Sequence, residues 1–194
     1  MNIILISGFS TSGKDVLGSI FCDKHGFTRF AFADSLKEIV SKKYGCAVDL
    51  LHTHEGKNSI CPATDTTWRA VLIKESLLYK ETEPDIFARI CAENIEKYSK
   101  TSHKLPYYVV TDWRFPNEFD TIRRIFPDAC IVPVRITCDS HNGISPVNDS
   151  SEYALQNMSR RNMLNITLQN SIFNDKIIDA LNIFADDIIT NIRL

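Results

Sequence analysis

Short apolar segments alternate with amphipathic stretches along most of the chain. Five of the apolar segments are rich in β-branched or aromatic residues and bounded by turn residues, which predicts buried strands. These segments are residues 3–6, 27–33, 107–111, 130–137 and 163–168. Pro133, inside the fourth segment, predicts a bulge or an edge position, because proline donates no hydrogen bond to a neighbouring strand.

The stretches between these strands predict helices, since their apolar residues recur every three or four positions. Helices are expected at residues 14–24, 36–44, 67–80, 84–98 and 174–192, from Pro116 onward, and in a short piece ending near 158. A capping box at Ser35–Glu38 predicts that the second helix begins at about residue 36. Residues 46–66 predict an irregular excursion with a short helical piece at 48–52.

Strands that alternate with helices predict an α/β protein. We expect one domain over residues 1–194, with a five-stranded parallel sheet in a three-layer α/β/α arrangement. In such a sheet, ligands gather at the carboxyl ends of the strands. Residues that follow the predicted strands are therefore the first candidates for function.

A glycine-rich loop after the first strand carries the clearest chemical signal. Residues 8–15 read Gly-Phe-Ser-Thr-Ser-Gly-Lys-Asp, and a helical pattern follows. Strand, glycine-rich loop, Gly-Lys and helix form the context of a phosphate-binding P-loop, whose backbone N–H groups and helix N-terminus surround phosphate oxygens. The predicted phosphate-binding residues are Gly8, Ser10, Thr11, Ser12, Gly13, Lys14, Asp15 and Val16.

Asp15 departs from the usual P-loop pattern. The position after the lysine normally carries Ser or Thr, whose hydroxyl binds Mg²⁺. A carboxylate beside polyphosphate is repelled unless Mg²⁺ or a cation lies between them. We predict that Asp15 binds Mg²⁺ directly or through water; the alternative is an acid that only favours the helix N-terminus.

Charged residues also follow the second and third predicted strands. Asp112 ends the third strand, where an acid in a P-loop protein orients Mg²⁺ or its waters, so it is the second predicted metal residue. Arg114 presents a fork suited to a phosphate. Asp34 and Lys37 follow the second strand, and Lys37 is either a phosphate ligand or a solvated charge. Glu118 is expected to complete a helix cap or to join the site.

Each of the remaining basic residues allows two interpretations, a binding role or an ordinary surface charge. Arg69 and Lys74 lie on a predicted helix and either bind substrate or form an ordinary charged face. Arg160 and Arg161 precede the fifth strand and either close on transferring phosphates or face solvent.

Composition narrows the class of protein. With 44% hydrophobic and 24% charged residues and a net charge of -2, the chain has no overall attraction to nucleic acid or anionic membranes. No apolar run has the length of a membrane span or the form of a signal peptide. The six cysteines are scattered without Cys-x-x-Cys spacing, which favours free thiols in a reducing, cytoplasmic compartment.

Four motifs together resemble the deoxynucleoside monophosphate kinases of tailed phages and some large viruses. They are Ser12-Gly13-Lys14-Asp15, Phe32-Ala33-Asp34-Ser35-Leu36-Lys37-Glu38, Asp112-Trp113-Arg114-Phe115-Pro116-Asn117-Glu118 and Ser151-Glu152. The animal-type phosphomevalonate kinases are similar in the Gly-Lys-Asp and Leu-Lys-Glu elements but lack the Arg-Phe-Pro-Asn-Glu run. Val16 departs from the phage pattern, which often has Thr there, and residues 46–66 match neither family.

The resemblance implies transfer of the ATP γ-phosphate to a deoxynucleoside 5′-monophosphate, with ATP and Mg²⁺ as cofactors. It implies catalytic roles for Lys14, Asp15, Asp112 and Arg114, with Asp15 and Asp112 on the metal. The implied substrate-binding residues are Asp34, Lys37, Arg69, Lys74, Arg114 and Glu152, and Arg160 would contact ATP. Residues 46–98 would form the acceptor-binding region and 139–162 a lid.

The resemblance also implies small-molecule substrates, no nucleic-acid or membrane partner, and a cytoplasmic location, in the host cell if the protein is virus-encoded. A homodimer, the base preference and the sugar preference stay open. Two alternatives also stay open: a phosphomevalonate-kinase-like enzyme, and an ATP-binding switch that transfers no phosphate.

Overall fold

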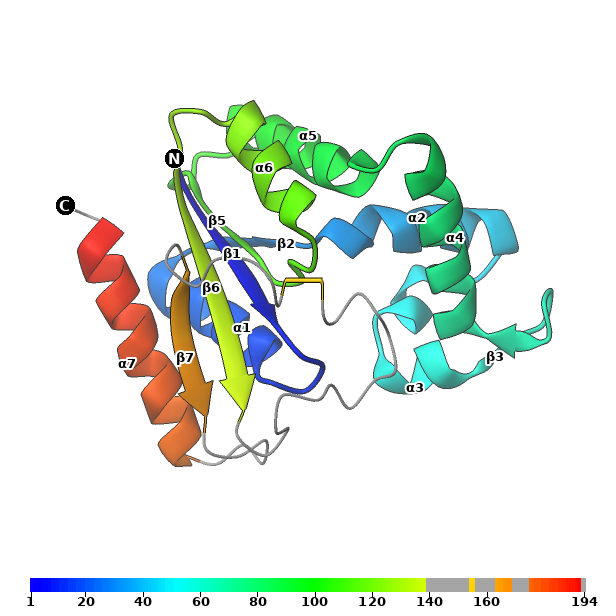
Figure 1. Ribbon diagram of the computed structural model, residues 1–194, viewed down its shortest axis with the longest axis horizontal. Coiled ribbons are helices and arrows are strands. Elements are labelled where there is room, and N and C mark those ends of the chain that lie inside the picture. The colour runs from blue at the N-terminus through cyan, green and yellow to red at the C-terminus, as the bar shows by residue number, and fades with distance from the viewer. Residues whose placement is uncertain (139–153, 156–162, 169–174, 193–194) are drawn as a thin grey trace.

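A parallel sheet of five strands forms the centre of the protein (Figure 1). The computed structural model describes residues 1–138, 154–155, 163–168 and 175–192. The strands are β1 (Asn2–Gly8), β2 (Thr28–Phe30), β5 (Tyr107–Val110), β6 (Cys130–Cys138) and β7 (Leu164–Leu168). Their order is β2-β5-β1-β6-β7, and every neighbouring pair is parallel. The predicted five-stranded α/β sheet is confirmed, although β2 is shorter than expected.

Helices cover both faces of the sheet. The side chains of β1 alternate between the two faces, and both sets are apolar, so both faces need to be buried. Ile3 and Leu5 are buried in a core with α2 (Phe32–Tyr44), α5 (Ile86–Thr101) and α6 (Pro116–Ile125). Ile4 and Ile6 are buried in a second core. That core contains residues of α1 (Lys14–His25) and α7 (Asp175–Ile192). The three-layer arrangement is therefore confirmed.

Pro133 lies in β6, between β1 and β7 in the sheet order. It faces Leu5 of β1, whereas the pairing of β6 with β7 begins only at Val134. At Pro133 the strand therefore has a partner on one side, and the missing N–H breaks no ladder on the other. The edge position predicted from the sequence holds locally, although β6 is not an edge strand along its whole length.

The segment between α2 and α5 forms a separate group of small elements at one side of the molecule (Figure 1). It contains η1 (Val48–Leu51), α3 (His54–Asn58), the hairpin strands β3 (Ile60–Cys61) and β4 (Thr66–Thr67), and α4 (Trp68–Thr82). The helical piece predicted at 48–52 is confirmed as η1. The sequence pattern did not predict α3 or the hairpin, because elements of five and two residues offer too few positions for a period to show.

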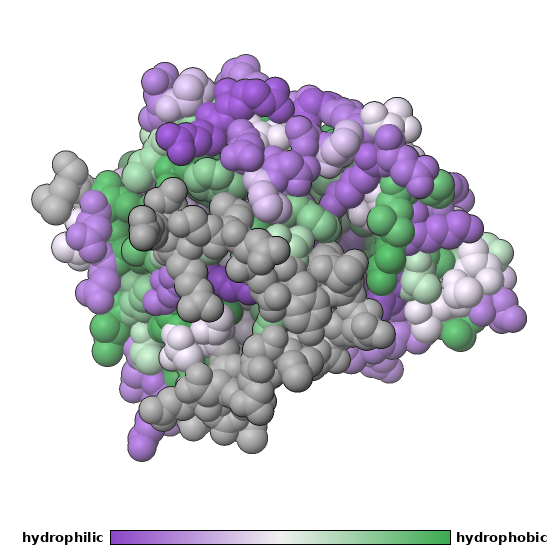
Figure 2. All heavy atoms as spheres, viewed as in Figure 1, coloured by the Kyte–Doolittle hydropathy of each residue, from purple (hydrophilic) through white to green (hydrophobic). Residues whose placement is uncertain are grey.

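Large apolar residues are exposed on α4. Ile73, Leu77 and Leu78 are between 40% and 60% exposed, and Figure 2 shows hydrophobic atoms in this part of the surface. The possible homodimer stays an untested prediction, and the sequence assigned no face to it. Among the residues that the structure covers, no helix combines the length and apolarity needed to span a bilayer. Glu152 and Arg160 lie outside the described residues, and so do the predicted lid and the short helix ending near 158, except for residues 154–155.

Candidate phosphate-binding site

The strand order brings three of the predicted functional segments to one edge of the sheet. β1 lies beside β5, and β5 lies beside β2. The carboxyl ends of these parallel strands therefore adjoin one another. The P-loop follows β1, Asp112 and Arg114 follow β5, and α2 with Asp34 and Lys37 follows β2.

The loop from β1 to α1 has the close-packed backbone expected of a P-loop. A Cβ atom on Gly8 would lie 2.5 Å from the carbonyl oxygen of Ile136 and 2.6 Å from Ser12 Oγ, so only glycine fits. Thr11 and Gly13 have φ angles of 63° and 99°, which turn the chain into the helix. Ser12 is 1% exposed, and its hydroxyl has no hydrogen-bond partner among the described residues. A buried, unused hydroxyl in such a loop is suited to a phosphate oxygen.

Lys14 and Asp15 occupy the start of α1. The Lys14 ammonium donates a hydrogen bond of 2.6 Å to the carbonyl oxygen of Phe9, so it folds back over its own loop. Asp15 is exposed in the first turn. The described residues contain no group of three or more His, Cys, Asp or Glu side chains placed to hold a metal. Mg²⁺ commonly binds through one or two carboxylates, waters and substrate phosphates, and Asp15 fits that kind of site.

Asp112 makes a contact that its sequence position did not predict. Its two carboxylate oxygens accept hydrogen bonds from the backbone N–H groups of Phe32 (2.8 Å) and Ala33 (2.9 Å). Asp112 therefore caps the N-terminus of α2 from 80 residues away along the chain. Its predicted metal role stays a prediction, and any such role has to use the lone pairs that the cap leaves.

The start of α2 differs from the prediction for the same reason. The helix begins at Phe32, not at about residue 36, so the capping box expected at Ser35–Glu38 is wrong. The Ser35 hydroxyl instead donates to the carbonyl oxygen of Phe32, within the first turn. Because the carboxylate of Asp112, in the segment after β5, satisfies the first N–H groups, the helix needs no local capping side chain.

Glu118 caps its own helix, α6, so the capping interpretation of this residue is confirmed. Its Oε2 accepts hydrogen bonds from the N–H groups of Arg114 (2.8 Å) and Phe115 (3.0 Å). The backbone of Arg114 is thereby held at the end of β5. Burial raises the pKa of Glu118 to about 7, against the lowering effect of these two N–H groups.

This raised pKa predicts how stability depends on pH. A carboxyl whose pKa is higher in the folded state stabilises the fold most below its unfolded pKa and loses that contribution as pH rises through the folded value. Glu118→Gln keeps an accepting oxygen and removes the charge. Between pH 4.5 and about 7, we expect the wild type to lose stability relative to this variant. The loss should be on the order of 3 kcal/mol.

Urea unfolding of both proteins at pH 5 and pH 8 measures this difference. Glu81→Gln, on the exposed surface of α4, is the matched control and should follow the wild type. A constant difference between Glu118→Gln and the wild type across this range would contradict the proposed cost of ionising Glu118.

Lys37 is held by two polar neighbours at the N-terminal half of α2. Its ammonium lies 3.1 Å from Asp34 Oδ1 and 3.3 Å from His52 Nδ1. The Lys37 side chain is only 12% exposed, which argues against a freely solvated charge. Asp34 also pairs with Arg29 at 3.3 Å. Asp34 therefore holds the Lys37 ammonium near the start of α2, and the substrate-binding role of both residues stays a prediction.

Lys57 is a basic residue near the predicted site that no pattern in the sequence singled out. It lies half-buried on α3, next to Asn58, whose side-chain oxygen accepts a hydrogen bond of 3.2 Å from Arg69 Nε. Burial lowers the pKa of Lys57, and the positive charges of Lys37, Arg69 and Arg114 lower it further, while Asp15 opposes them. These three cations therefore all act on the charge of Lys57. A single lysine in a polar stretch gave no signal in the sequence, because only the fold brings it to the others.

Lys74 is not brought to this cluster by the helix that carries Arg69. Five residues along an α-helix correspond to a rotation of about 140° between the two side chains. Lys74 is exposed, and its charge acts on the buried Glu75, which Lys43 and Tyr44 bind at 2.8 Å and 2.7 Å. The structure therefore favours the ordinary charged-face interpretation of Lys74.

Gly56 fixes the position of α3 and hence of Lys57. A Cβ on Gly56 would lie 2.0 Å from the carbonyl oxygen of Leu50. The Gly56 N–H donates to the Thr53 side chain, which caps the helix at 2.9 Å. We expect Gly56→Ala to displace α3, lowering stability by about 1–3 kcal/mol and weakening binding of any ligand at the cation cluster.

Thermal unfolding and phosphate binding of Gly56→Ala test this expectation. Gly26→Asn is the control, since a Cβ at Gly26 meets nothing within 4 Å and Asn tolerates its left-handed backbone. A Gly56→Ala protein with unchanged stability and ligand affinity would show that α3 is not locked.

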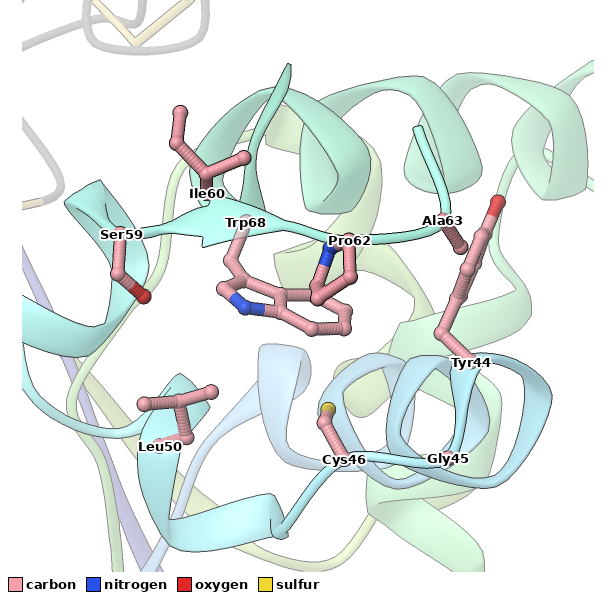
Figure 3. A pocket seen from close by; sticks show the side chains of 9 residues that line it. All are labelled: Tyr44, Gly45, Cys46, Leu50, Ser59, Ile60, Pro62, Ala63 and Trp68. Atoms are coloured by element: carbon pink, nitrogen blue, oxygen red, sulfur yellow. The ribbon is translucent and has the colours of Figure 1, made fainter. Parts of the chain in front are cut away.

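A cavity of about 340 Å³ opens beside this group of elements (Figure 3). The Trp68 indole lies across it, between the β3 strand and Leu50 of η1, and Tyr44 stands at one end. The Trp68 and Tyr44 rings meet edge to face at 6.1 Å between centroids. Trp68 directly precedes Arg69, so this apolar hollow adjoins the segment that carries the cation cluster.

Comparison of the sequence with protein-family models and with curated proteins gives no match. Among solved structures, a sugar kinase from Janibacter sp. is 14% identical, with a TM-score of 0.48 and coverage of 96% of this chain and 95% of that one. A gluconokinase from Sinorhizobium meliloti is 13% identical (TM-score 0.44; coverage 99% and 95%). Shikimate kinase from Aquifex aeolicus is 10% identical (TM-score 0.45; coverage 98% and 96%). These likenesses are too weak to carry an argument about activity.

The class of the protein follows from its own geometry. A parallel three-layer fold, a glycine-dependent loop after β1 and a lysine at the start of α1 define an α/β protein of the P-loop type.

Proposed function

We propose that this protein is a phosphotransferase that moves the γ-phosphate of ATP to a small acceptor which itself carries a phosphate. The observation that carries the proposal is a second set of cations beside the P-loop. Lys37 and Arg114 follow the strands β2 and β5 at the same edge of the sheet. Lys57 and Arg69 lie on α3 and α4, where Asn58, the neighbour of Lys57, accepts a hydrogen bond from Arg69. Four cations held together repel one another, and bound phosphate reverses the sign of that interaction. A P-loop that only binds and hydrolyses a nucleotide has no need of this second anion site.

In the proposed reaction, different residues would bind the ATP phosphates, the metal and the acceptor. Lys14 and the P-loop backbone would hold the β- and γ-phosphates, and Ser12 would offer its buried hydroxyl. Asp15 would hold Mg²⁺ or its waters, and bound Mg²⁺ would neutralise the charge on the transferring group. Lys37, Arg69 and Arg114 would position the acceptor phosphate in line with the γ-phosphate. The acceptor oxygen is already anionic at neutral pH, so the reaction needs positioning more than a strong base.

A deoxynucleoside monophosphate is the acceptor that we propose. Its support is the resemblance in four motifs, above all the Arg114–Glu118 run, together with the polar contacts around Lys37. The elements of residues 46–98 would form the acceptor-binding region, and the cavity beside Trp68 has a size suited to a small ring system. Residues 139–162 would close over the reacting phosphates.

A steady-state assay with ATP and Mg²⁺ against a panel of acceptors tests this function. The panel contains the four deoxynucleoside monophosphates, their ribose counterparts, phosphomevalonate, gluconate and shikimate. We expect turnover with at least one deoxynucleoside monophosphate and little ATP hydrolysis without an acceptor. If phosphomevalonate is the only acceptor phosphorylated, the proposed deoxynucleoside monophosphate acceptor is wrong and phosphomevalonate takes its place. Tight ATP binding with no turnover on any acceptor would favour an ATP-binding switch and overturn the proposal.

A further inference from the structure

Lys80 lies where α4 meets the segment that carries Arg114. Its ammonium is 3.8 Å from the centre of the Phe115 ring and 4.0 Å from Oε1 of Glu118. A cation within about 6 Å of an aromatic face is attracted to it, so the Phe115 ring and the Glu118 carboxylate both attract this ammonium. The Lys80 side chain is 23% exposed and that of Glu118 only 6%, so salt screens these contacts less than it screens a surface pair.

The segment that Lys80 contacts has a hydrogen-bonded backbone. Oε2 of Glu118 accepts hydrogen bonds from the N–H groups of Arg114 and Phe115. The indole N–H of Trp113 donates to the carbonyl oxygen of Phe115 at 2.9 Å. Lys80 therefore contacts both the ring of Phe115 and the carboxylate that binds the backbone of Arg114. A displacement of either group would move the Arg114 side chain with it.

The helix that carries Lys80 also carries Arg69, in its first turn. Eleven residues of an α-helix make about three full turns, so these two side chains leave α4 on nearly the same face, about 16 Å apart along its axis. Arg69 Nε donates a hydrogen bond of 3.2 Å to Asn58 of α3. Figure 1 shows α4 extending from the β3 hairpin toward α5. One face of α4 thus contacts α3 at one end and the Arg114 segment at the other.

From these contacts, we infer that Lys80 is a positioning residue that holds the Arg114 segment at a fixed place relative to Arg69. The inference rests on the proposed phosphotransferase function, in which both arginines bind the acceptor phosphate, and adds a residue to it. A guanidinium fork binds phosphate bidentately only in the correct orientation. A misplacement of about 1 Å far from the chemistry can cost about 100-fold in rate. In this role Lys80 transfers no proton and contacts no reacting atom.

Two ordinary roles of a lysine at this position make different predictions. Lys80 lies in the last turn of α4, where any cation favours the helix dipole. Its alkyl stem also covers apolar surface, whatever the charge does. Methionine keeps an unbranched stem and a high helix propensity, whereas arginine keeps the charge and stacks on aromatic rings. These two substitutions therefore separate the packing of Lys80 from its charge.

The kinetic test compares Lys80→Met and Lys80→Arg with the wild type, using the best acceptor of the panel. We expect Lys80→Met to raise KM for the acceptor about tenfold, to lower kcat about tenfold and to leave KM for ATP within about threefold. Lys80→Arg should stay within about threefold of the wild type in all three constants. Lys42→Met is the matched control, because Lys42 is an exposed lysine in the last turn of α2, and it should match the wild type. Unchanged kinetics of Lys80→Met, or equal losses in both Lys80 variants, would overturn the positioning role.

A double-mutant cycle on binding of inorganic tripolyphosphate separates the positioning role from the proposed function. We expect Lys80→Met and Arg114→Met each to weaken binding about threefold or more in calorimetry. The double variant should bind no more weakly than Arg114→Met, because Lys80 acts through Arg114. If no acceptor is phosphorylated but the losses are non-additive, the proposed function fails and the positioning role stands. Turnover of an acceptor combined with additive losses, or with unchanged affinity in either single variant, would leave the function and overturn the role of Lys80.

Phe115→Leu tests the same contact from its other side and serves if Lys80→Met does not fold, which its melting temperature shows. It removes the ring that faces the ammonium and leaves Lys80 and Glu118 in place. We expect its affinity for tripolyphosphate to fall about threefold, since the attraction between cation and ring is lost. An affinity equal to that of the wild type would overturn the positioning role.

Discussion

Replacing Lys14 with methionine is expected to lower the rate of phosphoryl transfer at least 100-fold while the protein stays folded. The Lys14 ammonium is the positive charge that the P-loop carries into the site, and it lies over the loop in contact with the Phe9 carbonyl. Losing one preorganised charge contact at the transferring group costs about 3 kcal/mol or more in the barrier. Steady-state kinetics with the best acceptor of the panel measures the effect.

Lys97→Met is the control for this change. Lys97 is exposed on α5, on an element that contributes no residue to the site, so its loss should leave kcat and both Michaelis constants unchanged. Circular dichroism and melting temperature establish that Lys14→Met is folded. More than half of the wild-type turnover in this variant would refute the assignment of the P-loop.

Asp112→Ala is expected to destabilise the protein by about 2–4 kcal/mol, because it leaves two backbone N–H groups of α2 without their acceptor. The carboxylate of Asp112 binds both Phe32 and Ala33, and the start of α2 also carries Asp34 and Lys37. Fraying of this helix end should therefore weaken acceptor binding as well. Asp112→Asn keeps one accepting oxygen and should fall between the two proteins in stability.

Urea unfolding of Asp112→Ala, Asp112→Asn and the exposed control Asp120→Ala measures the cap directly. Activity titrated with Mg²⁺ in the same variants measures the predicted metal role. A cap alone predicts a loss of stability with an unchanged Mg²⁺ midpoint. Full stability combined with a shifted midpoint would assign Asp112 to the metal and show that the α2 contacts contribute little.

The position of Asp112 at the end of β5 is compatible both with a helix cap and with a metal ligand. The sequence placed an acid at the end of the right strand, beside the P-loop strand. It did not show that the N-terminus of α2 lies against that acid, because the two segments are 80 residues apart. A helix N-terminus attracts a carboxylate as a metal ion does, so position alone does not decide between them.

What the sequence determined by itself is local. The five strands, the main helices and the P-loop each leave a pattern within a few neighbouring residues, through side-chain periodicity or through glycines that a turn requires. The sequence also placed charged residues after particular strands. The cap formed by Glu118 on the N–H groups of Arg114 and Phe115 was predictable as one of two roles, because all its partners lie within four residues.

What only the tertiary structure decided are the relations between distant segments. The start of α2 depends on Asp112, and the place of Lys57 depends on a five-residue helix locked by Gly56 against Leu50. The raised pKa of Glu118 depends on its burial, which the local sequence does not show. In each case the deciding interaction joins groups that meet only when the sheet forms and the helices pack. The sequence around each residue therefore cannot predict that interaction.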